Sequence, residues 1–263
     1  MIPGADVAAE PSALGAPYIE LRAITHRYGP ILALDGVDFK VHRREIVGLV
    51  GDNGAGKSTL IKILSGVLQP TRGEIFVDGR RTTFDSARVA MNCGMETIYQ
   101  DMNLIDGMDI MRNIFFGREA TFPLGFLKIG EMKRTAMEIL EKEITIEGIR
   151  SPHQLVGNLS GGQKQAVSIA RAMYFKNQVL LLDEPTSALS VRETQAFLDH
   201  ITRLRDEGLS VVIVTHNLFH AYQVADRFVV LSHGKKVEDT LRDRTSAEEL
   251  TRIVVGKQVG GPG

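Results

Sequence analysis

Residues 51–59, GDNGAGKST, carry the residue types that bind a phosphate group, at the spacing G-x-x-x-x-G-K-[ST]. The segment follows a short apolar run, EIVGLV, and precedes a pattern typical of a helix. Glycines allow successive backbone N–H groups to turn toward one anion, and the helix start adds partial positive charge. Lys57 is expected to reach the β- and γ-phosphates, and Ser58 to offer its hydroxyl to Mg²⁺.

The plainer alternative for this segment is a glycine-rich turn with a solvated lysine, which the flanking strand and helix make the weaker interpretation. We therefore predict that the whole segment binds nucleotide. The predicted binding residues are Gly51, Asp52, Asn53, Gly54, Ala55, Gly56, Lys57, Ser58 and Thr59.

A pair of carboxylates stands at the end of a second apolar run, VLLLDEP, at residues 179–185. Ligands of open α/β sheets bind at the carboxyl ends of the strands, where Asp183 and Glu184 would lie. Asp183 is expected to hold Mg²⁺ through water, and Glu184 to polarise a water for in-line attack on the γ-phosphate. Alone, Asp-Glu-Pro after a strand is a common cap and turn. Together with residues 51–59, it predicts a nucleotide site.

A third motif, LSGGQ at residues 159–163, precedes that strand and is called the signature motif below. Ser160 fits a helix N-cap, and Gly161 and Gly162 would let a phosphate approach the helix start. With the three motifs in this order, residues 18–236 resemble the ATPase subunit of an ABC (ATP-binding cassette) transporter. The resemblance implies ATP and Mg²⁺ as cofactors and ATP hydrolysis as the activity.

The resemblance also implies roles for single residues. Tyr28 matches the aromatic residue that stacks on adenine, although an ordinary rim tyrosine is the alternative. Gln100 matches the glutamine that touches Mg²⁺ or the attacking water, with a solvated loop glutamine as the alternative. His216, after the apolar run VVIVT, matches the histidine that contacts the γ-phosphate; an isolated histidine would more often be structural. The implied catalytic residues are Glu184, His216 and Gln100, and the implied metal ligands are Ser58, Gln100 and Asp183.

In this family the signature motif serves the nucleotide of the opposite subunit. Ser160, Gly161, Gly162 and Gln163 would close over the γ-phosphate held by residues 51–59 of a second ATPase subunit, so we expect a head-to-tail dimer, most simply of identical chains. The segment SALS, residues 187–190, departs from the common form that ends in Asp. Ser190 cannot carry that charge, which puts coupling across the dimer through this position in doubt.

Softer signals resemble the simple-sugar importer branch: DEPTSALS, NIFFGRE and VADRFVVLSHGKK. They imply integral-membrane permease subunits, a periplasmic or extracellular solute-binding protein, and a peripheral location on the cytoplasmic face of the inner membrane. One cassette is present, whereas ribose-type relatives commonly carry two, so the chain looks closer to single-cassette members for fructose or similar monosaccharides. Residues 101–118 are our candidate permease contact because they include Met102, Met108 and Met111; buried packing of these methionines is the alternative.

The elements that must position these residues alternate between strands and helices, which predicts an α/β fold with a mostly parallel sheet. We expect a P-loop (RecA-like) core, an N-terminal antiparallel β subdomain and an inserted α-helical subdomain. The predicted boundaries are an arm at 1–17, the ATPase domain at 18–245 with its insertion at about 101–175, and a C-terminal helix and tail at 246–263. Helices are predicted at 57–68, 131–141, 163–175, 191–205 and 218–225, and near Ser246.

Composition limits the alternatives. Lys and Arg number 31 against 32 Asp and Glu, a formal charge of −1, which argues against a nucleic-acid partner. No run approaches the roughly 18 apolar residues of a membrane span. The single cysteine, Cys93, forms no internal disulfide, which favours a reducing compartment. An ABC-type ATPase for another solute, and a soluble one acting on DNA or ribosomes, remain the alternative functions.

Overall fold

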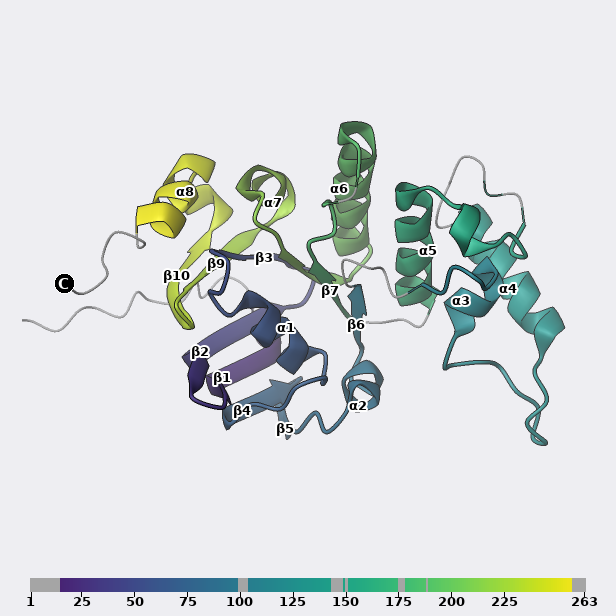
Figure 1. Cartoon of the computed structure of the whole chain (residues 1–263), viewed down its shortest axis with the longest axis horizontal. Coiled ribbons are helices and arrows are strands. Elements are labelled where there is room, and N and C mark those ends of the chain that lie inside the picture. The colour runs from purple at the N-terminus through teal and green to yellow at the C-terminus, as the bar shows by residue number, and fades with distance from the viewer. Residues whose placement is uncertain are drawn as a thin grey trace, which may run out of the picture.

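The computed structural model describes residues 15–98, 104–142, 149, 151–174, 178–187 and 189–256. In this part of the chain two sheets lie side by side, and a group of helices stands at one end (Figure 1). The prediction of an α/β fold with a mostly parallel sheet is confirmed.

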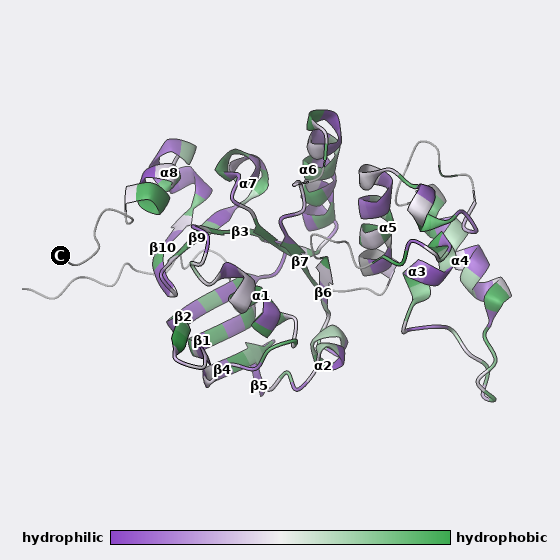
Figure 2. Ribbon diagram, viewed as in Figure 1, coloured by the Kyte–Doolittle hydropathy of each residue, from purple (hydrophilic) through white to green (hydrophobic). Residues whose placement is uncertain are grey.

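The larger sheet has six strands in the order β10-β9-β3-β8-β7-β6. All neighbours are parallel except β9 and β10. The strands β3, β8 and β9 are buried at every residue, as their apolar sequences require for the centre of a parallel sheet (Figure 2). The bounds are β3 Ile46–Gly51, β6 Met95–Ile98, β7 Val179–Asp183, β8 Ser210–Val214, β9 Arg227–Ser232 and β10 Lys235–Leu241.

The smaller sheet is antiparallel, with the order β2-β1-β4-β5, and confirms the expected N-terminal β subdomain. Its strands are β1 Pro17–Tyr28, β2 Ile31–His42, β4 Arg72–Val77 and β5 Arg80–Thr82. The helix α1, Lys57–Leu64, contributes Leu60, Ile61 and Leu64 to the apolar core that this sheet shares with one face of the larger sheet. The short helix α2, Ala87–Asn92, adds Ala90 to the same core.

The other face of the larger sheet is covered by three helices. They are α6 Val191–Asp206, α7 Leu218–Val224 and α8 Ala247–Gly256. The last helix begins near Ser246, as predicted, and Ser246 caps it, since the Glu249 N–H donates to Ser246 Oγ at 3.1 Å.

The inserted helices have an apolar core of their own, built from Ile110, Ile114, Met132 and Val167 with their neighbours. They are α3 Ile110–Phe115, α4 Ile129–Lys142 and α5 Gly161–Tyr174, and they stand apart from β10 and α8 at the far end of the molecule (Figure 1). This confirms a helical subdomain inserted into the α/β fold. The exact boundaries, including the arm at 1–17, stay predictions.

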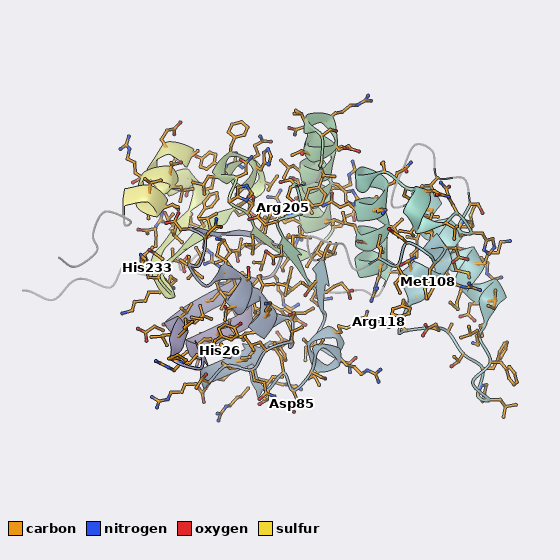
Figure 3. All side chains as sticks on the ribbon, viewed as in Figure 1. His26, Asp85, Met108, Arg118, Arg205 and His233 are labelled. Atoms are coloured by element: carbon orange, nitrogen blue, oxygen red, sulfur yellow. The ribbon has the colours of Figure 1, made fainter. Side chains whose placement is uncertain are left out.

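Ion pairs join the helical subdomain to the edge of the large sheet. Arg118 lies between β6 and the helices (Figure 3), with its Nη2 3.1 Å from Glu96 Oε2. Arg171 of α5 places Nε 3.4 Å from the other oxygen, Glu96 Oε1. One carboxylate of β6 therefore holds two arginines of the subdomain.

The first helix after the phosphate loop is shorter than the predicted span 57–68. It ends at Leu64 because Gly66 adopts a left-handed conformation, φ 70°. The N–H of Gly66 donates to Ile63 O and that of Val67 to Lys62 O, which is the Schellman pattern of a helix end. Val67 and Leu68 therefore continue the apolar pattern outside the helix.

A buried ion pair links the smaller and larger sheets. Arg227 at the start of β9 donates from Nε to Glu45 Oε1 at 2.6 Å and from Nη1 to Asp239 Oδ1 at 2.7 Å. Its Nη2 also donates to the Lys40 carbonyl at 2.7 Å.

Among the described helices, none is long and apolar enough to cross a bilayer.

Candidate nucleotide-binding site

The phosphate loop joins β3 to α1, as the sequence predicts. Gly56 stands just before the helix with φ 102°, and the Leu60 N–H donates to its carbonyl at 2.9 Å. A Cβ at Gly56 would lie 2.7 Å from the Ala33 carbonyl oxygen, so only glycine fits there. The N-terminus of α1 therefore opens directly onto the loop.

Neighbouring turns hold the loop in place. The Ala55 carbonyl accepts from the Gly234 N–H at 3.1 Å, and the Gly234 carbonyl accepts from the Asp35 N–H at 2.8 Å. Gly51 lies against the Leu231 carbonyl so closely that a Cβ would overlap it. The loop is thus fixed by both β2 and the turn between β9 and β10.

Lys57 folds back over this loop. Its Nζ donates to the carbonyls of Gly51 at 2.7 Å and Asp52 at 2.8 Å, and the residue is buried. Burial lowers the pKa of Lys57, and the carboxylates of Glu184, Asp52 and Asp183 oppose that effect. An anion in the loop would give this ammonium a partner of opposite charge.

Ser58, Asn53 and Gly54 are exposed, whereas Ala55 and Thr59 are buried. The Ala55 N–H is already committed to the Asp52 carbonyl at 3.1 Å. The exposed Ser58 hydroxyl at the helix start is therefore free of the packing that fixes its neighbours.

Asp183 ends β7 at the edge of the sheet where the loop lies. Burial raises the pKa of Asp183, the adjacent Glu184 raises it further, and Lys57 acts in the opposite direction. A hard oxygen ligand in such a place suits Mg²⁺, because a bound cation would offset the neighbouring negative charge. The oxygen of Ser58 and the carboxylate of Asp183 fit that ion in type and charge.

Glu184 is held by the adjacent strand and its following histidine. Its backbone is left-handed, φ 50°, a conformation that non-glycine residues rarely adopt, and its N–H donates to the Val214 carbonyl at 2.8 Å. The side chain accepts from the His216 N–H at 3.0 Å, and His216 Nδ1 lies 2.9 Å from Glu184 Oε2. Two of the three residues predicted to be catalytic, Glu184 and His216, are therefore in direct contact.

A further set of side chains supports this pair. Gln165 of α5 donates from Nε2 to the Pro185 carbonyl at 2.8 Å. Thr186 Oγ1 lies 3.2 Å from His220 Nδ1, and the Asn217 side chain lies 3.3 Å from the other ring nitrogen. Sequence reasoning missed the contacts of Gln165 and Thr186 because they join segments 20 and 34 residues apart along the chain.

The signature motif starts α5 in the helical subdomain. The Gln163 N–H donates to Ser160 Oγ at 3.3 Å, while the Ser160 N–H donates to Gln163 Oε1 at 2.9 Å. This reciprocal pair is a capping box, so the expected N-cap role of Ser160 is present. Gly161 and Gly162 form the first turn beside it, and Ser160 is exposed.

The segment that departs from the family pattern also caps a helix. Ser190 and Glu193 form a capping box at the start of α6. The spacing S-x-x-E could have identified it from the sequence. Glu193 also lies against Gly162 of the signature motif. No local spacing in the sequence predicts that contact.

Three predictions remain, which concern Tyr28, Gln100 and the candidate permease contact. Tyr28 ends β1 with 43% of its surface exposed and packs edge-to-face on His26 at 4.7 Å, while Ala33 of the paired strand β2 contacts the loop. Gln100 lies outside the described residues. Of the candidate permease contact, Met102 is also outside them, Met108 is half-buried and Met111 is buried in the helical core. Packing is thus the main role of Met111.

The parallel sheet, the glycine-rich loop on a helix start and the carboxylates at the strand ends define a P-loop nucleotide-binding protein. The family model described as ABC transporter matches residues 34–187. The chain therefore belongs to the ABC transporter family. The ATP-binding proteins of this family hydrolyse ATP, and ATP is the nucleotide of the site.

Curated relatives support this assignment over most of the chain. The chain is 43% identical to the xylose/arabinose import ATP-binding protein of Sulfolobus acidocaldarius over 92% of its own length and 95% of that protein. It is 39% identical to the fructose import ATP-binding protein of Rhizobium meliloti, covering 84% and 87%. It is 41% identical to a ribose import ATP-binding protein of Rubrobacter xylanophilus, covering 92% of the chain but about half of that relative, 48%.

Solved structures agree on the fold. A nucleotide-free ATP-binding cassette from an ABC transporter superposes with a TM-score of 0.80 at 23% identity, covering 94% of this chain and all of that one (100%). A bacterial ABC transporter cassette described as dimeric superposes with a TM-score of 0.72 at 27% identity, covering 85% and 98%. The expected core, β subdomain and helical subdomain are those of an ABC cassette.

Proposed function

We propose that this chain is the ATPase subunit that powers import of a monosaccharide through a separate permease. The contact between Glu184 and His216 beside the phosphate loop carries the hydrolytic part of the proposal. The match to nearly the full length of a xylose/arabinose import protein supports the transport part. The chain would work at the cytoplasmic face of the inner membrane, with a solute-binding protein acting outside.

In this proposal residues 51–59 bind the phosphates of ATP and Tyr28 stacks on its adenine. Lys57 exchanges its present carbonyl partners for phosphate oxygens, which stabilise its charge better than neutral carbonyls do. Ser58 and Asp183, with Gln100, hold Mg²⁺, which when bound would neutralise negative charge on the phosphates.

Glu184 accepts a proton from the attacking water. The His216 N–H and ring nitrogen fix both carboxylate oxygens, so the base is oriented before the water arrives. His216, whose side chain is 70% exposed, can then reach toward the γ-phosphate when a second subunit covers it. Hydrolysis needs that second subunit because, as in the family that the chain belongs to, Ser160, Gly161, Gly162 and Gln163 of one chain would close over the γ-phosphate bound by the other.

We further propose that two copies of the chain form the ATP sandwich and that residues 104–118, with the adjoining 101–103, contact the permease. The domain division at 17, at 245 and around the insertion 101–175 belongs to the same proposal. Its support is that the helices α3, α4 and α5 have a core separate from both sheets.

The decisive variant is Glu184→Gln, which keeps the hydrogen-bonding shape and removes the base. We expect hydrolysis to fall at least about 100-fold while ATP binding is retained, and a dimer to accumulate with ATP, measured by phosphate release and light scattering. Glu207→Gln, at the exposed end of α6, is the matched control. Wild-type turnover in Glu184→Gln would refute the assignment of the base.

The transport part is tested by reconstitution with the cognate permease and binding proteins loaded with xylose, arabinose, ribose or fructose. We expect one or two of the loaded binding proteins to stimulate ATP hydrolysis. ATP hydrolysis that the permease does not stimulate but DNA or ribosomes do would contradict the transport function. It would favour the soluble ABC-type ATPase instead.

A further inference from the structure

The carboxylate of Glu193 joins the starts of two helices, α5 and α6. Its Oε2 accepts from the Ser190 N–H at 3.0 Å and from the Ser190 hydroxyl at 2.7 Å, which caps α6. The same carboxylate lies against Gly162, in the first turn of α5: a Cβ built on Gly162 would lie 3.1 Å from Glu193 Oε1.

Oxygens of the same chain already lie at the start of α5. The first turn of a helix has N–H groups with no partner inside the helix. Here the Gln163 N–H donates to Ser160 Oγ, and the carboxylate of Glu193 lies beside Gly162. A phosphate that approaches this helix start would therefore meet the Glu193 carboxylate.

Glu193 also brings charge to this place. Hydrogen bonds from the Ser190 N–H and hydroxyl hold the pKa of Glu193 below its ordinary value, so the group is ionised at neutral pH. A negative charge at a helix start is favourable, and a phosphate at the same start would gain from the same interaction. Because both are anions, they also repel each other at this distance.

We propose that Glu193 is an internal competitor for the signature-motif anion site, which must leave Gly162 before the γ-phosphate bound by a second copy of the chain can take its place. This rests on the proposed function, in which the motif closes over that phosphate. Glu193 can leave Gly162 while keeping its bonds to Ser190, so α6 stays capped in both states.

This role also gives meaning to Ser190. The family pattern has Asp at this position, and here the uncharged Ser190 instead holds the carboxylate of Glu193, three residues along the chain. The charge is thus present in the segment but directed at the signature motif of the same chain. Glu193 thereby raises the ATP concentration at which two chains close on each other.

The test measures the ATP concentration that gives half-maximal dimer in chains carrying Glu184→Gln, by light scattering. Adding Glu193→Gln keeps an oxygen to accept from Ser190 and removes the charge. We expect the half-maximal ATP concentration to fall about fivefold, the effect of about 1 kcal/mol at a helix start. Binding of ATP to the monomer, measured with a fluorescent nucleotide under dilute conditions, should stay unchanged.

Two further variants separate competition from capping. Asp199→Asn removes one exposed charge farther along α6 and should leave the half-maximal ATP concentration where it was. Glu193→Ala, which also lacks the charge but cannot cap, should lower the half-maximal ATP concentration as Glu193→Gln does while lowering the melting temperature more. A role in capping alone would move the melting temperature and not the ATP dependence.

The outcomes are distinguishable. A half-maximal ATP concentration that is unchanged or higher in both Glu193 variants would overturn the competitor role and leave the proposed function intact. Failure of the Glu184→Gln chain to form any dimer with ATP would overturn the proposed function, and the competitor role with it.

Discussion

The phosphate loop and the signature motif each stand at a helix N-terminus, but the chain builds them differently. The loop sits between two sheets, and turns around Gly234 and Leu231 hold it from behind. The signature motif stands on a subdomain with a separate core, is capped by a side chain of its own first turn, and lies against Glu193. We therefore expect the core with the loop to be the rigid half of the molecule and the helical subdomain to be the movable half.

This difference suggests that one chain carries the proposed hydrolytic residues but needs the signature motif of a second chain to close its site. Glu184 and His216, which we propose to be catalytic, follow strands β7 and β8 of the sheet that carries the loop, so the proposed hydrolytic residues all belong to the core. The signature motif would complete the site of another chain. Changes in the two halves should therefore have separable effects.

The largest effect is expected from breaking the rigid half. Lys57→Ala removes the only side chain whose ammonium is buried in the loop among the described residues. ATP affinity should fall at least about 100-fold, the loss of about 3 kcal/mol from a charge-assisted contact. A fluorescent nucleotide titration measures it, with Lys62→Ala on the exposed side of α1 as the control. Undiminished affinity would show that the backbone of the loop binds the phosphates alone.

The second prediction is an equally large loss of ATP hydrolysis with no loss of ATP affinity. Ser160→Arg places a bulky cation at the exposed start of α5, where it blocks a second chain. Hydrolysis should fall about 100-fold with ATP affinity unchanged, measured by phosphate release and nucleotide titration. Thr121→Arg, exposed elsewhere on the subdomain, controls for the added charge. If Ser160→Arg hydrolysed ATP normally, the two halves would not cooperate across chains.

How far the sequence predicts the molecule follows the same division. The loop, β3 and α1 are contiguous, so glycine spacing and apolar periodicity predict them, and only the helix end at Gly66 differs. The contact of Glu184 with His216 depends on β7 pairing with β8. The strand-end pattern identified Glu184, and the resemblance identified His216. The contact of Glu193 with Gly162 joins two helix starts that no local pattern relates. Gln100 stays a prediction.

The third effect concerns stability of the rigid half. Burial by itself raises the pKa of Glu45, but hydrogen bonds from His42 and Arg227 outweigh it and hold the pKa at about 2. The ionised pair therefore contributes stability at pH above about 4.5, the ordinary value, and this is lost as pH falls toward about 2. Glu45→Gln should cost about 3 kcal/mol of unfolding free energy at pH 7, since it strands a buried guanidinium.

Urea unfolding at pH 7 and at pH 3 measures that contribution. The difference between wild type and Glu45→Gln should shrink at the lower pH, because the Glu45 carboxyl of the unfolded chain, with its ordinary pKa of 4.5, is then protonated and that favours unfolding. Asp78→Asn, which breaks the exposed ion pair with Arg43, is the control and should cost less than about 1 kcal/mol. Equal costs for the buried and exposed pairs would contradict the rigid character assigned to the core.

The smallest effect probes whether the movable half unfolds by itself. Asn113 is 1% exposed and ties the chain before α3 together, accepting from the Ile105 N–H at 2.7 Å and donating to the carbonyls of Ile105 and Asp109. Asn113→Ala should cost about 2 kcal/mol, because several buried backbone groups lose their partner. Since the helical core is separate, amide exchange should speed up in α3 and α4 and not in β3. The control Asn158→Ala, at an exposed residue, should leave amide exchange unchanged in α3, α4 and β3. Equally faster exchange in β3 of Asn113→Ala would mean that both halves unfold as one unit.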